Sequence, residues 1–181
     1  MERERLRWIT IALLLAPVWS CSSDRSTLLQ PEAGVESYRQ FNVPENLIRN
    51  LELAYTKRDI DAFDELLAPE FVFRFQPGDA RELGRDSWGR EEEIQSTRNL
   101  FESSRVKDIQ IRLHYLPAEP STEKGLEHTM KVLVTQAFLT VREEEAVYQV
   151  PGHPQEFFLR RDHRNHPERW MIVEWRDLPP R

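Results

Sequence analysis

The sequence has few of the residues that form disulfides, phosphate-binding loops or nucleophilic active sites in small domains. Its 181 residues include one cysteine, Cys21, so no disulfide can join two parts of the chain. A protein of this size without disulfides relies on a hydrophobic core. The six glycines form no glycine-rich phosphate loop, and we find neither a nucleophile elbow nor a cysteine placed as a nucleophile. These absences exclude disulfide-stapled scaffolds and the commonest motifs for phosphate binding and covalent catalysis.

The sequence also lacks a concentrated basic surface. The net charge is -6, whereas a nucleic-acid-binding domain usually carries a basic face that displaces counterions from phosphates. We therefore expect no nucleic-acid partner. Asp162, His163 and His166 lie close together in the sequence, but they do not have the spacing of a zinc site. No metal and no other cofactor is expected.

An apolar run near the amino terminus, from Trp8 to Val18, is too short for a membrane-spanning helix, which needs about twenty residues. Three arginines precede the run, and a small residue and the cysteine follow it, which is the layout of an export signal. Its end, Val18-Trp19-Ser20-Cys21, resembles the lipobox of a bacterial lipoprotein. The resemblance implies that residues 1–20 are removed as a signal peptide and that Cys21 carries a lipid anchor, which is stable when more than one acyl chain is attached.

Residues 21–42 are polar and show no sustained periodicity, so we expect a flexible tether there. A single folded domain is expected at residues 43–181. Ser22 after the cysteine resembles the pattern of lipoproteins that are sorted to the outer membrane. We therefore expect a protein of the cell envelope, anchored to the periplasmic face of the outer membrane.

Two helices are predicted at the start of the domain. Pro44 suits the first turn of a helix, because its missing N–H needs no partner there. Asp59 is a suitable N-cap for a second helix, which Pro69 is expected to end. The apolar residues that share one face of the first helix are Leu47, Ile48, Leu51, Ala54 and Tyr55.

A strand and a third helix are predicted next. The three phenylalanines between residues 71 and 75 alternate with other residues, so they share one face of a strand. Residues 76–87 read as a loop that is long enough to hide a short strand. Ser87 or Asp86 can cap a third helix, whose first turn contains three glutamates at residues 91–93. We interpret these glutamates as a solvated turn rather than a metal site.

The remainder of the chain alternates as strands. We predict strands near residues 109–115, 129–141, 147–150, 157–159 and 170–175. The strand at 129–141 has apolar residues on both faces, so both faces are expected to be at least partly covered. These residues are Met130, Val132, Val134 and Phe138 on one face, and Leu133, Ala137, Leu139 and Val141 on the other. Helices followed by antiparallel strands predict an α+β fold.

Two segments carry a family resemblance: LELAYTKRDIDAFDELLAPEFVFRF at residues 51–75 and RWMIVEWRD at residues 169–177. Together with the order of elements, they resemble the nuclear transport factor 2-like superfamily, which includes SnoaL-like and ketosteroid-isomerase-like domains. The resemblance implies a cone-shaped fold, with three N-terminal helices packed on a curved, mostly antiparallel sheet, a pocket at the open end and a homodimer. A fold does not by itself assign a function.

Enzymes of this fold use a carboxylate in an apolar pocket for proton transfer. Glu174 is the candidate, because strict alternation places it on a strand face with Trp170, Ile172 and Arg176. The alternative interpretation is that Glu174 forms an ion pair with Arg74 or Arg176 on the outer side of the sheet.

Eight aromatic side chains are candidates either for an apolar pocket or for the core: Tyr55, Phe71, Phe73, Phe75, Trp88, Phe101, Trp170 and Trp175. Because no catalytic constellation accompanies the anchor pattern, we expect a lipid-anchored envelope protein that binds a small apolar ligand or another envelope protein without catalysis. The alternative is a proton-transfer enzyme, an isomerase, dehydratase or cyclase, with Glu174 as its base.

Overall fold

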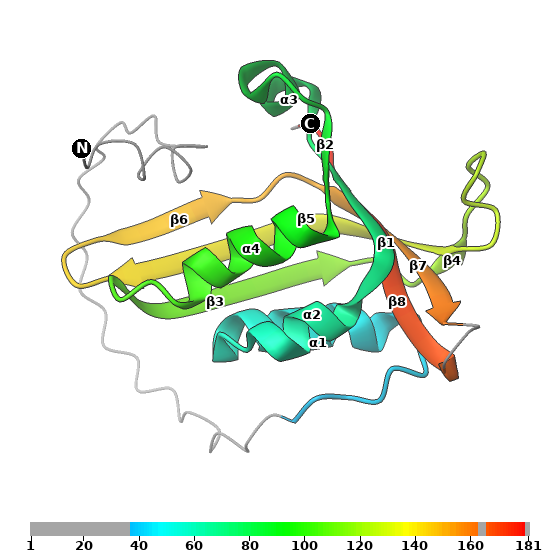
Figure 1. Cartoon of the computed structure of the whole chain (residues 1–181), viewed down its shortest axis with the longest axis horizontal. Helices are drawn as coiled ribbons and strands as arrows, with labels where there is room; N and C mark the ends of the chain where they lie inside the picture. Colours follow the sequence, from blue (N-terminus) through cyan, green and yellow to red (C-terminus); the bar gives the residue numbers. More distant parts are fainter. Residues whose placement is uncertain (1–36, 163–165, 180–181) are drawn as a thin grey trace, which may run out of the picture. The chain divides into compact units, whose positions relative to one another are not determined.

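The structure is a computed structural model that describes residues 37–162 and 166–179. The predicted signal peptide and Cys21 lie outside these residues, so both stay predictions. In the described chain no helix is both long enough and apolar enough to cross a membrane. The elements, shown in Figure 1, are α1 (Pro44–Lys57), α2 (Ile60–Leu66), β1 (Leu67–Arg74), α3 (Pro77–Leu83), β2 (Ser87–Gly89), α4 (Arg90–Phe101), β3 (Val106–Tyr115), β4 (Glu119–Pro120), β5 (Met130–Glu143), β6 (Val147–Pro151), β7 (Gln155–Asp162) and β8 (His166–Asp177).

The first two helices form where the sequence predicts them. Pro44 occupies the first turn of α1, and the predicted apolar stripe of this helix is buried. The C-cap of α1 is Arg58, whose φ of 56° places it in the left-handed region. Asp59 then caps α2 by accepting the backbone N–H of Ala62 at 3.0 Å. Capping residues therefore fix the sharp change of direction between the two helices.

The segment between α2 and α4 differs from the prediction. β1 begins directly after Leu66, so Pro69 lies inside a strand, within an irregular part of the β1–β8 pairing where a missing N–H is tolerated. The predicted loop contains a short helix, α3, rather than a strand, and the strand β2 follows it. The N-cap of α4 is consequently Gly89, not Ser87 or Asp86.

One sheet forms the second layer of the domain. Its strand order is β2-β1-β8-β7-β5-β3, with β4 and β6 also paired to β5. β1 and β8 run parallel, and the other pairs are antiparallel. The helices α1, α2 and α4 lie on one side of the sheet, whereas α3 stands apart beyond them (Figure 1). We call the helix-covered side of the sheet the inner face and the other side the outer face. This arrangement confirms the predicted α+β fold with a curved, mostly antiparallel sheet.

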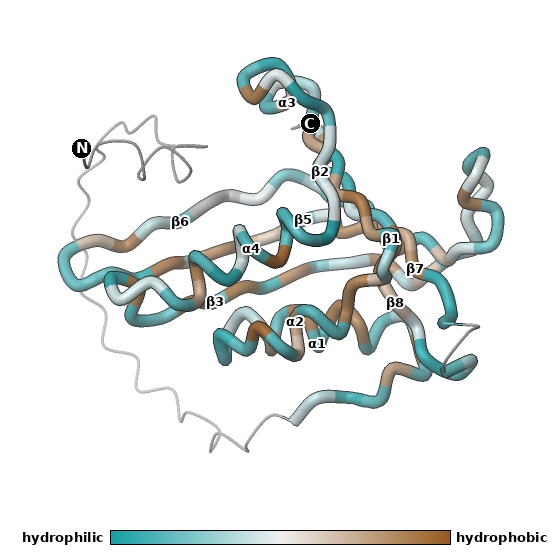
Figure 2. Tube along the Cα trace, in the orientation of Figure 1, coloured by the Kyte–Doolittle hydropathy of each residue, from teal (hydrophilic) through white to brown (hydrophobic). Residues whose placement is uncertain are grey.

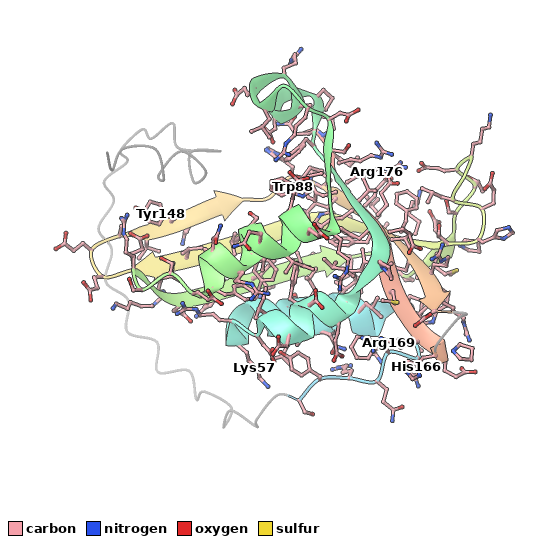
Figure 3. All side chains as sticks on the ribbon, in the orientation of Figure 1. Lys57, Trp88, Tyr148, His166, Arg169 and Arg176 are labelled. Atoms are coloured by element: carbon pink, nitrogen blue, oxygen red, sulfur yellow. The ribbon has the colours of Figure 1, made fainter. Side chains whose placement is uncertain are left out.

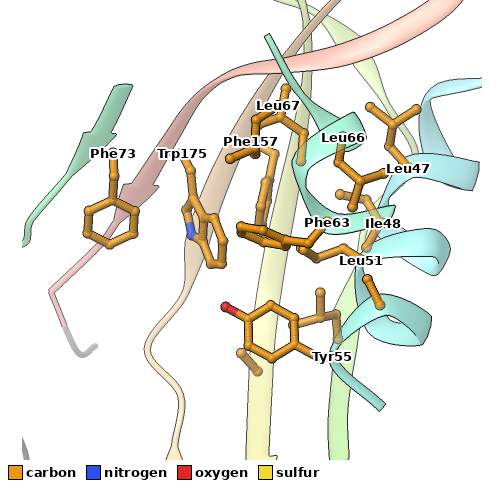
Figure 4. Close-up of a cluster of buried hydrophobic side chains, with 14 of the residues drawn as sticks. Leu47, Ile48, Leu51, Tyr55, Phe63, Leu66, Leu67, Phe73, Phe157 and Trp175 are labelled. Atoms are coloured by element: carbon orange, nitrogen blue, oxygen red, sulfur yellow. The ribbon is translucent and has the colours of Figure 1, made fainter. Parts of the chain in front are cut away.

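The core lies between the helices and the inner face. Figure 4 shows Leu51, Tyr55 and Phe63 of α1 and α2 meeting Phe157 and Trp175 of the sheet. Burial of such side chains stabilises the fold by roughly 1.5–3 kcal/mol each. No residue of α3 is buried, and Figure 2 colours this helix mostly hydrophilic. α3 therefore lies at the edge of the domain and contributes little to its core.

An extra residue in β5 explains why its apolar residues follow two patterns. The pairing with β3 shifts around Thr135, which has no partner there. Such a bulge reverses the alternation of side chains, so Val134 before it and Ala137 after it both belong to the inner core. Phe138 is left 47% exposed. The predicted assignment of Val134 and Ala137 to opposite faces of the strand is therefore wrong.

Candidate functional site

A second extra residue, in β8, decides which side chains reach the inner face near the end of this strand. In the pairing of β7 with β8, Phe158 is opposite Glu174 but Leu159 is opposite Ile172, which leaves Val173 without a partner. The extra residue reverses the alternation of side chains from that point on. The end of β8 therefore presents the opposite face from the one that strict alternation predicts.

The two hydrophobic clusters of the domain show this reversal. Ile172, before the bulge, and Trp175, after it, both belong to the main core on the inner face. Val173 belongs to a small separate cluster on the outer face. Trp175 and Asp177 consequently face inward, whereas Glu174 faces outward. The predicted sharing of one face by Glu174 and Ile172 is wrong for this reason.

Glu174 is buried and ion-paired. Its Oε1 lies 2.8 Å from Nε of Arg74 on β1 and also accepts from Nε of Arg176. The guanidinium of Arg176 lies 4.4 Å from the ring centroid of Phe158 and 2.5 Å from Glu123. These contacts confirm the alternative interpretation, an ion pair on the outer side of the sheet. Glu174 also lines a cavity with Val72, Leu126 and Val173, but two guanidinium groups hold its carboxylate there, whereas the catalytic carboxylate that the fold implies lies in an apolar pocket.

Four of the predicted pocket aromatics lie together. Their ring centroids are 5.0–5.6 Å apart, in edge-to-face and tilted pairs that suit aromatic rings. We call this group the aromatic cluster; it consists of Phe73, Phe75, Trp88 and Trp175. Phe75 and Trp88 are only half-buried, so the cluster extends from the core to the surface.

The other four predicted pocket residues are Tyr55, Phe71, Phe101 and Trp170. The first three are buried in the core, where Tyr55 and Phe101 meet edge to face at 5.2 Å. Trp170 is half-buried and lies nearer the start of β8. Figure 3 shows its sequence neighbour Arg169 well apart from Trp88. The structure therefore separates Trp170 from the aromatic cluster.

Glu93, in the first turn of α4, is a buried carboxyl beside the cluster that the sequence analysis missed. It is 5% exposed, whereas Glu91 and Glu92 are exposed. The indole N–H of Trp88 donates to Oε2 of Glu93 at 2.7 Å. Burial raises the pKa of Glu93 to about 7; the charge of Asp177 adds to the rise, and the bond from Trp88 opposes it. The interpretation of these glutamates as a solvated turn is therefore wrong for Glu93.

Asp177 is the second inward-facing carboxyl. It is paired across the strands with Gln155, whose Nε2 donates to Oδ1 of Asp177 at 3.0 Å. Burial raises the pKa of Asp177 to about 6, and the negative charge of Asp79 on α3 adds to the rise. The charge of Asp177 also raises the pKa values of Glu93 and Tyr55. These acidic groups therefore share one region.

Two buried polar atoms in this region have no hydrogen-bond partner among the described residues: Nε1 of Trp175 and Oε1 of Gln155. Trp175 pairs with Phe157 across the strands, and Gln155 pairs with Asp177. The unpaired donor and the unpaired acceptor are thus diagonal neighbours on one face of the β7–β8 ladder, roughly 7–8 Å apart at their backbones. Leaving a buried polar group unpaired costs about 1–3 kcal/mol. Elsewhere among the described residues, Nε of Arg169 and Nε1 of Trp170 are also buried and unpaired.

Tyr55 borders the region from α1. Figure 4 shows its hydroxyl directed towards the side on which Trp175 and Phe73 lie. Burial raises the pKa of Tyr55, the charge of Glu93 adds to the rise, and Thr97 interacts with both of these side chains. We call the whole group the inner carboxyl site; it consists of Glu93, Asp177, Tyr55, Trp88, Thr97, Gln155 and Trp175.

The site offers a ligand carboxyl groups, two unpaired hydrogen-bonding atoms and aromatic ring faces. Across residues 37–162 and 166–179, no three or more His, Cys, Asp or Glu side chains are grouped so that they could hold a metal ion. His163, one of the residues considered for a metal, lies outside this part of the chain.

No protein-family model matches the chain, and neither does any of the curated proteins. Several solved structures match at TM-scores above 0.5, and three of them illustrate the likeness. A conserved protein from Planctomyces limnophilus is 18% identical with a TM-score of 0.57, and the match covers 74% of this chain and 91% of that one. The beta subunit of the benzoate 1,2-dioxygenase from Burkholderia mallei is 13% identical with a TM-score of 0.53, and the match covers 74% and 86%.

The third is a protein from Catenulispora acidiphila in complex with S-DNPA, which is 15% identical with a TM-score of 0.51 and covers 74% of this chain and 88% of its own. At such identities the likeness concerns the fold alone. The helices on a curved, mostly antiparallel sheet, together with these neighbours, show that the chain has the nuclear transport factor 2-like fold that its sequence resembles.

Proposed function

We propose that the domain binds a small ligand at the inner carboxyl site without catalysing a reaction on it. One observation carries the proposal: Nε1 of Trp175 and Oε1 of Gln155 are buried without partners beside the carboxyl of Asp177. Buried polar groups are normally hydrogen-bonded, so a ligand that pairs these atoms stabilises the bound state. The aromatic cluster supplies an apolar surface at the same place. A neighbour with the same fold, the Catenulispora acidiphila protein, was solved in complex with S-DNPA.

Two-dimensional NMR of the ¹⁵N-labelled full-length chain tests this proposal. Small amphipathic aromatic compounds are titrated into the protein, and the indole N–H signal of Trp175 is followed after its assignment with Trp175→Phe. Binding moves this signal because the N–H gains an acceptor. Trp170 is the matched control: its Nε1 is likewise buried without a partner among the described residues, but it lies apart from the aromatic cluster, so its indole signal should stay in place. The proposal fails if no compound moves the Trp175 signal or if both signals move equally.

The proposal includes a membrane anchor on Cys21. Its support is the sequence pattern at residues 18–21 and the polar stretch that follows it. The end of the predicted tether belongs to the folded domain instead, because Tyr38 donates to Asp59 and Phe41 packs against the core. A tethered domain would meet soluble ligands at the membrane surface, on the periplasmic face of the outer membrane. Metabolic labelling with a palmitate analogue tests the anchor: the wild-type chain is expected to be labelled and Cys21→Ala is not. Equal labelling of the two chains removes lipidation from the proposal.

A second function, proton transfer, is favoured by one specific observation. The pKa values of about 7 for Glu93 and about 6 for Asp177 suit a general acid or base near neutral pH. This alternative replaces Glu174 by the inward-facing carboxyls. Exchange of the benzylic protons of phenylacetone into D₂O tests it by NMR. Acceleration that is lost in Asp177→Asn but kept in Glu174→Gln supports proton transfer, and a rate equal to that in buffer overturns it.

A further inference from the structure

We infer that the ligand of the inner carboxyl site is a small organic amine that binds as a cation and also carries a hydroxyl or carbonyl oxygen. The inference rests on the ligand-binding function proposed above and adds the chemical class of the ligand. Three independent features of the site support it: its uncompensated negative charge, its aromatic faces and its unpaired hydrogen-bonding atoms.

The first feature is the charge. No lysine, arginine or histidine of the described chain acts on Glu93 or Asp177. Asp177 acts on Glu93, Asp79 of α3 acts on Asp177, and the other partners are the neutral side chains of Trp88, Thr97 and Gln155. The basic residue that contacts the aromatic cluster, Arg85, is paired instead with Glu92 at 2.5 Å. A buried carboxylate without a counter-charge is unfavourable. A ligand ammonium supplies the missing positive charge.

The second feature is the aromatic cluster. The face of an aromatic ring attracts a cation whose centre lies within about 6 Å. The guanidinium of Arg85 already lies 5.2 Å from the ring centroid of Trp88 and 5.9 Å from that of Phe75. These rings are half-buried, whereas Phe73 and Trp175 are buried. Arg85 therefore already lies against the half-buried end of the cluster, and the buried rings of Phe73 and Trp175 offer a ligand cation further aromatic surface.

The third feature identifies the polar groups of the ligand. Oε1 of Gln155 lacks a donor, and an ammonium N–H supplies one. Nε1 of Trp175 lacks an acceptor, although this side chain is only 6% exposed. An ammonium group has no lone pair to accept that N–H. The ligand therefore needs an oxygen as well as the amine, within the reach of diagonal neighbours on the β7–β8 ladder.

Three probes of one size and shape separate these features. They are 2-amino-1-phenylethanol, 1-phenyl-1,2-ethanediol and mandelate, which share the phenyl ring and the hydroxyl but end in an ammonium, a hydroxyl and a carboxylate. Each is titrated into the full-length ¹⁵N-labelled chain at pH 7.5. We expect the amine to bind at least about ten-fold more tightly than the diol, mandelate to bind most weakly, and the Trp175 indole signal to move with the amine.

The pH dependence gives a second measurement. Between pH 5.5 and 7.5 the carboxyls of Glu93 and Asp177 ionise while the amine stays protonated. Binding of the amine should therefore tighten as the pH rises, and binding of the diol should change little. Glu93→Gln and Asp177→Asn should each reduce the preference for the amine over the diol. Glu91→Gln is the matched control, because this neighbouring carboxylate is exposed, and it should keep the preference.

Two results overturn the amine assignment. If the three probes bind equally, the site binds ligands but does not select cations, so the proposed ligand-binding function survives and the inference fails. If none of the three probes binds, the inference also fails. The proposed ligand-binding function is then tested on its own by the shift of the Trp175 indole signal with the wider set of aromatic compounds. The inference is also contradicted if Glu91→Gln abolishes the preference for the amine as strongly as Asp177→Asn does. In that case the negative charge that attracts the amine lies outside the inner carboxyl site.

Discussion

Trp88 donates its indole N–H to the carboxyl of Glu93 over 2.7 Å, and this bond joins β2 to the first turn of α4. The N-terminal turn of a helix stabilises negative charge, yet burial outweighs this effect and raises the pKa of Glu93. The carboxyl is therefore held in a protonation state that responds to pH near neutrality. Its neighbours Glu91 and Glu92 remain exposed. One turn of helix thus carries two exposed carboxylates and one interior carboxyl.

The first prediction concerns the pH dependence of stability. The pKa of Glu93 rises from 4.5 to about 7 on folding, so the folded state binds this proton more tightly than the unfolded state. The resulting stabilisation is complete below about pH 4.5 and is lost as the pH rises towards 7. It amounts to about 3 kcal/mol. Asp177, raised from 3.8 to about 6, acts in the same direction.

Glu93→Gln should therefore be more stable than the wild type at pH 8 and differ little from it at pH 5, because glutamine can still accept the indole N–H of Trp88. Urea unfolding at the two pH values measures the effect, and Glu91→Gln is the control. Wild-type and Glu93→Gln curves that shift equally with pH would contradict the prediction.

The helices and strands in which apolar residues repeat at a constant spacing could be predicted from the sequence. The stripe from Leu47 to Tyr55 repeats at three and four residues, and it is buried. The caps Pro44 and Asp59 have local reasons that do not depend on the rest of the chain. The alternation of Phe71 and Phe73 likewise predicts a buried strand face. These features are local, so local sequence is enough to find them.

The site depends on features that alternation does not reveal. The bulge at Val173 exchanges the faces of Glu174 and Trp175, because one extra residue reverses every later side chain. The bulge cannot be predicted from the residue at position 173, because valine is common in regular strands. Asp177 was consequently missed as an inward-facing carboxyl.

Glu93 could have been found from the sequence. It lies four residues before Thr97 and eight before Phe101, so all three share the inner stripe of α4. The run of three acidic residues hid this periodicity, because a charge run is most often a solvated surface. The short helix α3 was missed for another reason: none of its side chains is buried, so it has no apolar period.

The second prediction separates the two sides of β8. Glu174→Gln removes the charge that Arg74 and Arg176 share. We expect a loss of about 1–2 kcal/mol of stability, discounted because Arg74 is 46% exposed. Binding of the amine probe should not change. Asp177→Asn should do the reverse, weakening amine binding without loss of stability at pH 8. Chemical unfolding and NMR titration of both variants measure these effects. If Glu174→Gln loses binding of the amine probe but keeps its stability, the assignment of Glu174 to the outer face of the sheet is wrong.

The third prediction concerns Arg58, the C-cap of α1. Its guanidinium donates to the carbonyls of Val106 at 2.9 Å and Ser103 at 3.1 Å, and also to that of Phe101. These bonds tie the end of α1 to the end of α4 and the start of β3. Arg58→Ala should destabilise the fold by about 2–3 kcal/mol, because three carbonyls lose a charged donor.

Arg58→Gly separates this side-chain effect from the backbone effect. Glycine adopts a φ of 56° without strain, so it should recover about 1 kcal/mol relative to alanine while still lacking the guanidinium. Thermal unfolding of the wild type and both variants gives the order wild type, glycine, alanine. A glycine variant as stable as the wild type would mean that the guanidinium bonds contribute no more than the roughly 1 kcal/mol of backbone strain that glycine relieves.

The last prediction concerns Gly152, which joins β6 to β7. Its N–H donates to the carbonyl of Ala137 at 2.7 Å, and a Cβ added to it would lie only 2.3 Å from that backbone oxygen. A backbone atom cannot rotate away as a side chain can, so Gly152→Ala must displace β5 or the connection itself, at a cost of about 2–3 kcal/mol.

Gly89→Ala is the matched control, because a Cβ there meets nothing within 4 Å, and it should cost under about 1 kcal/mol as a weaker helix cap. Urea midpoints of the two variants measure the difference. If Gly152→Ala is destabilised but the Trp175 indole signal is unchanged, the contact between Gly152 and Ala137 supports the sheet without affecting the inner carboxyl site. Equal stability of the two variants would contradict the close approach of Gly152 to Ala137.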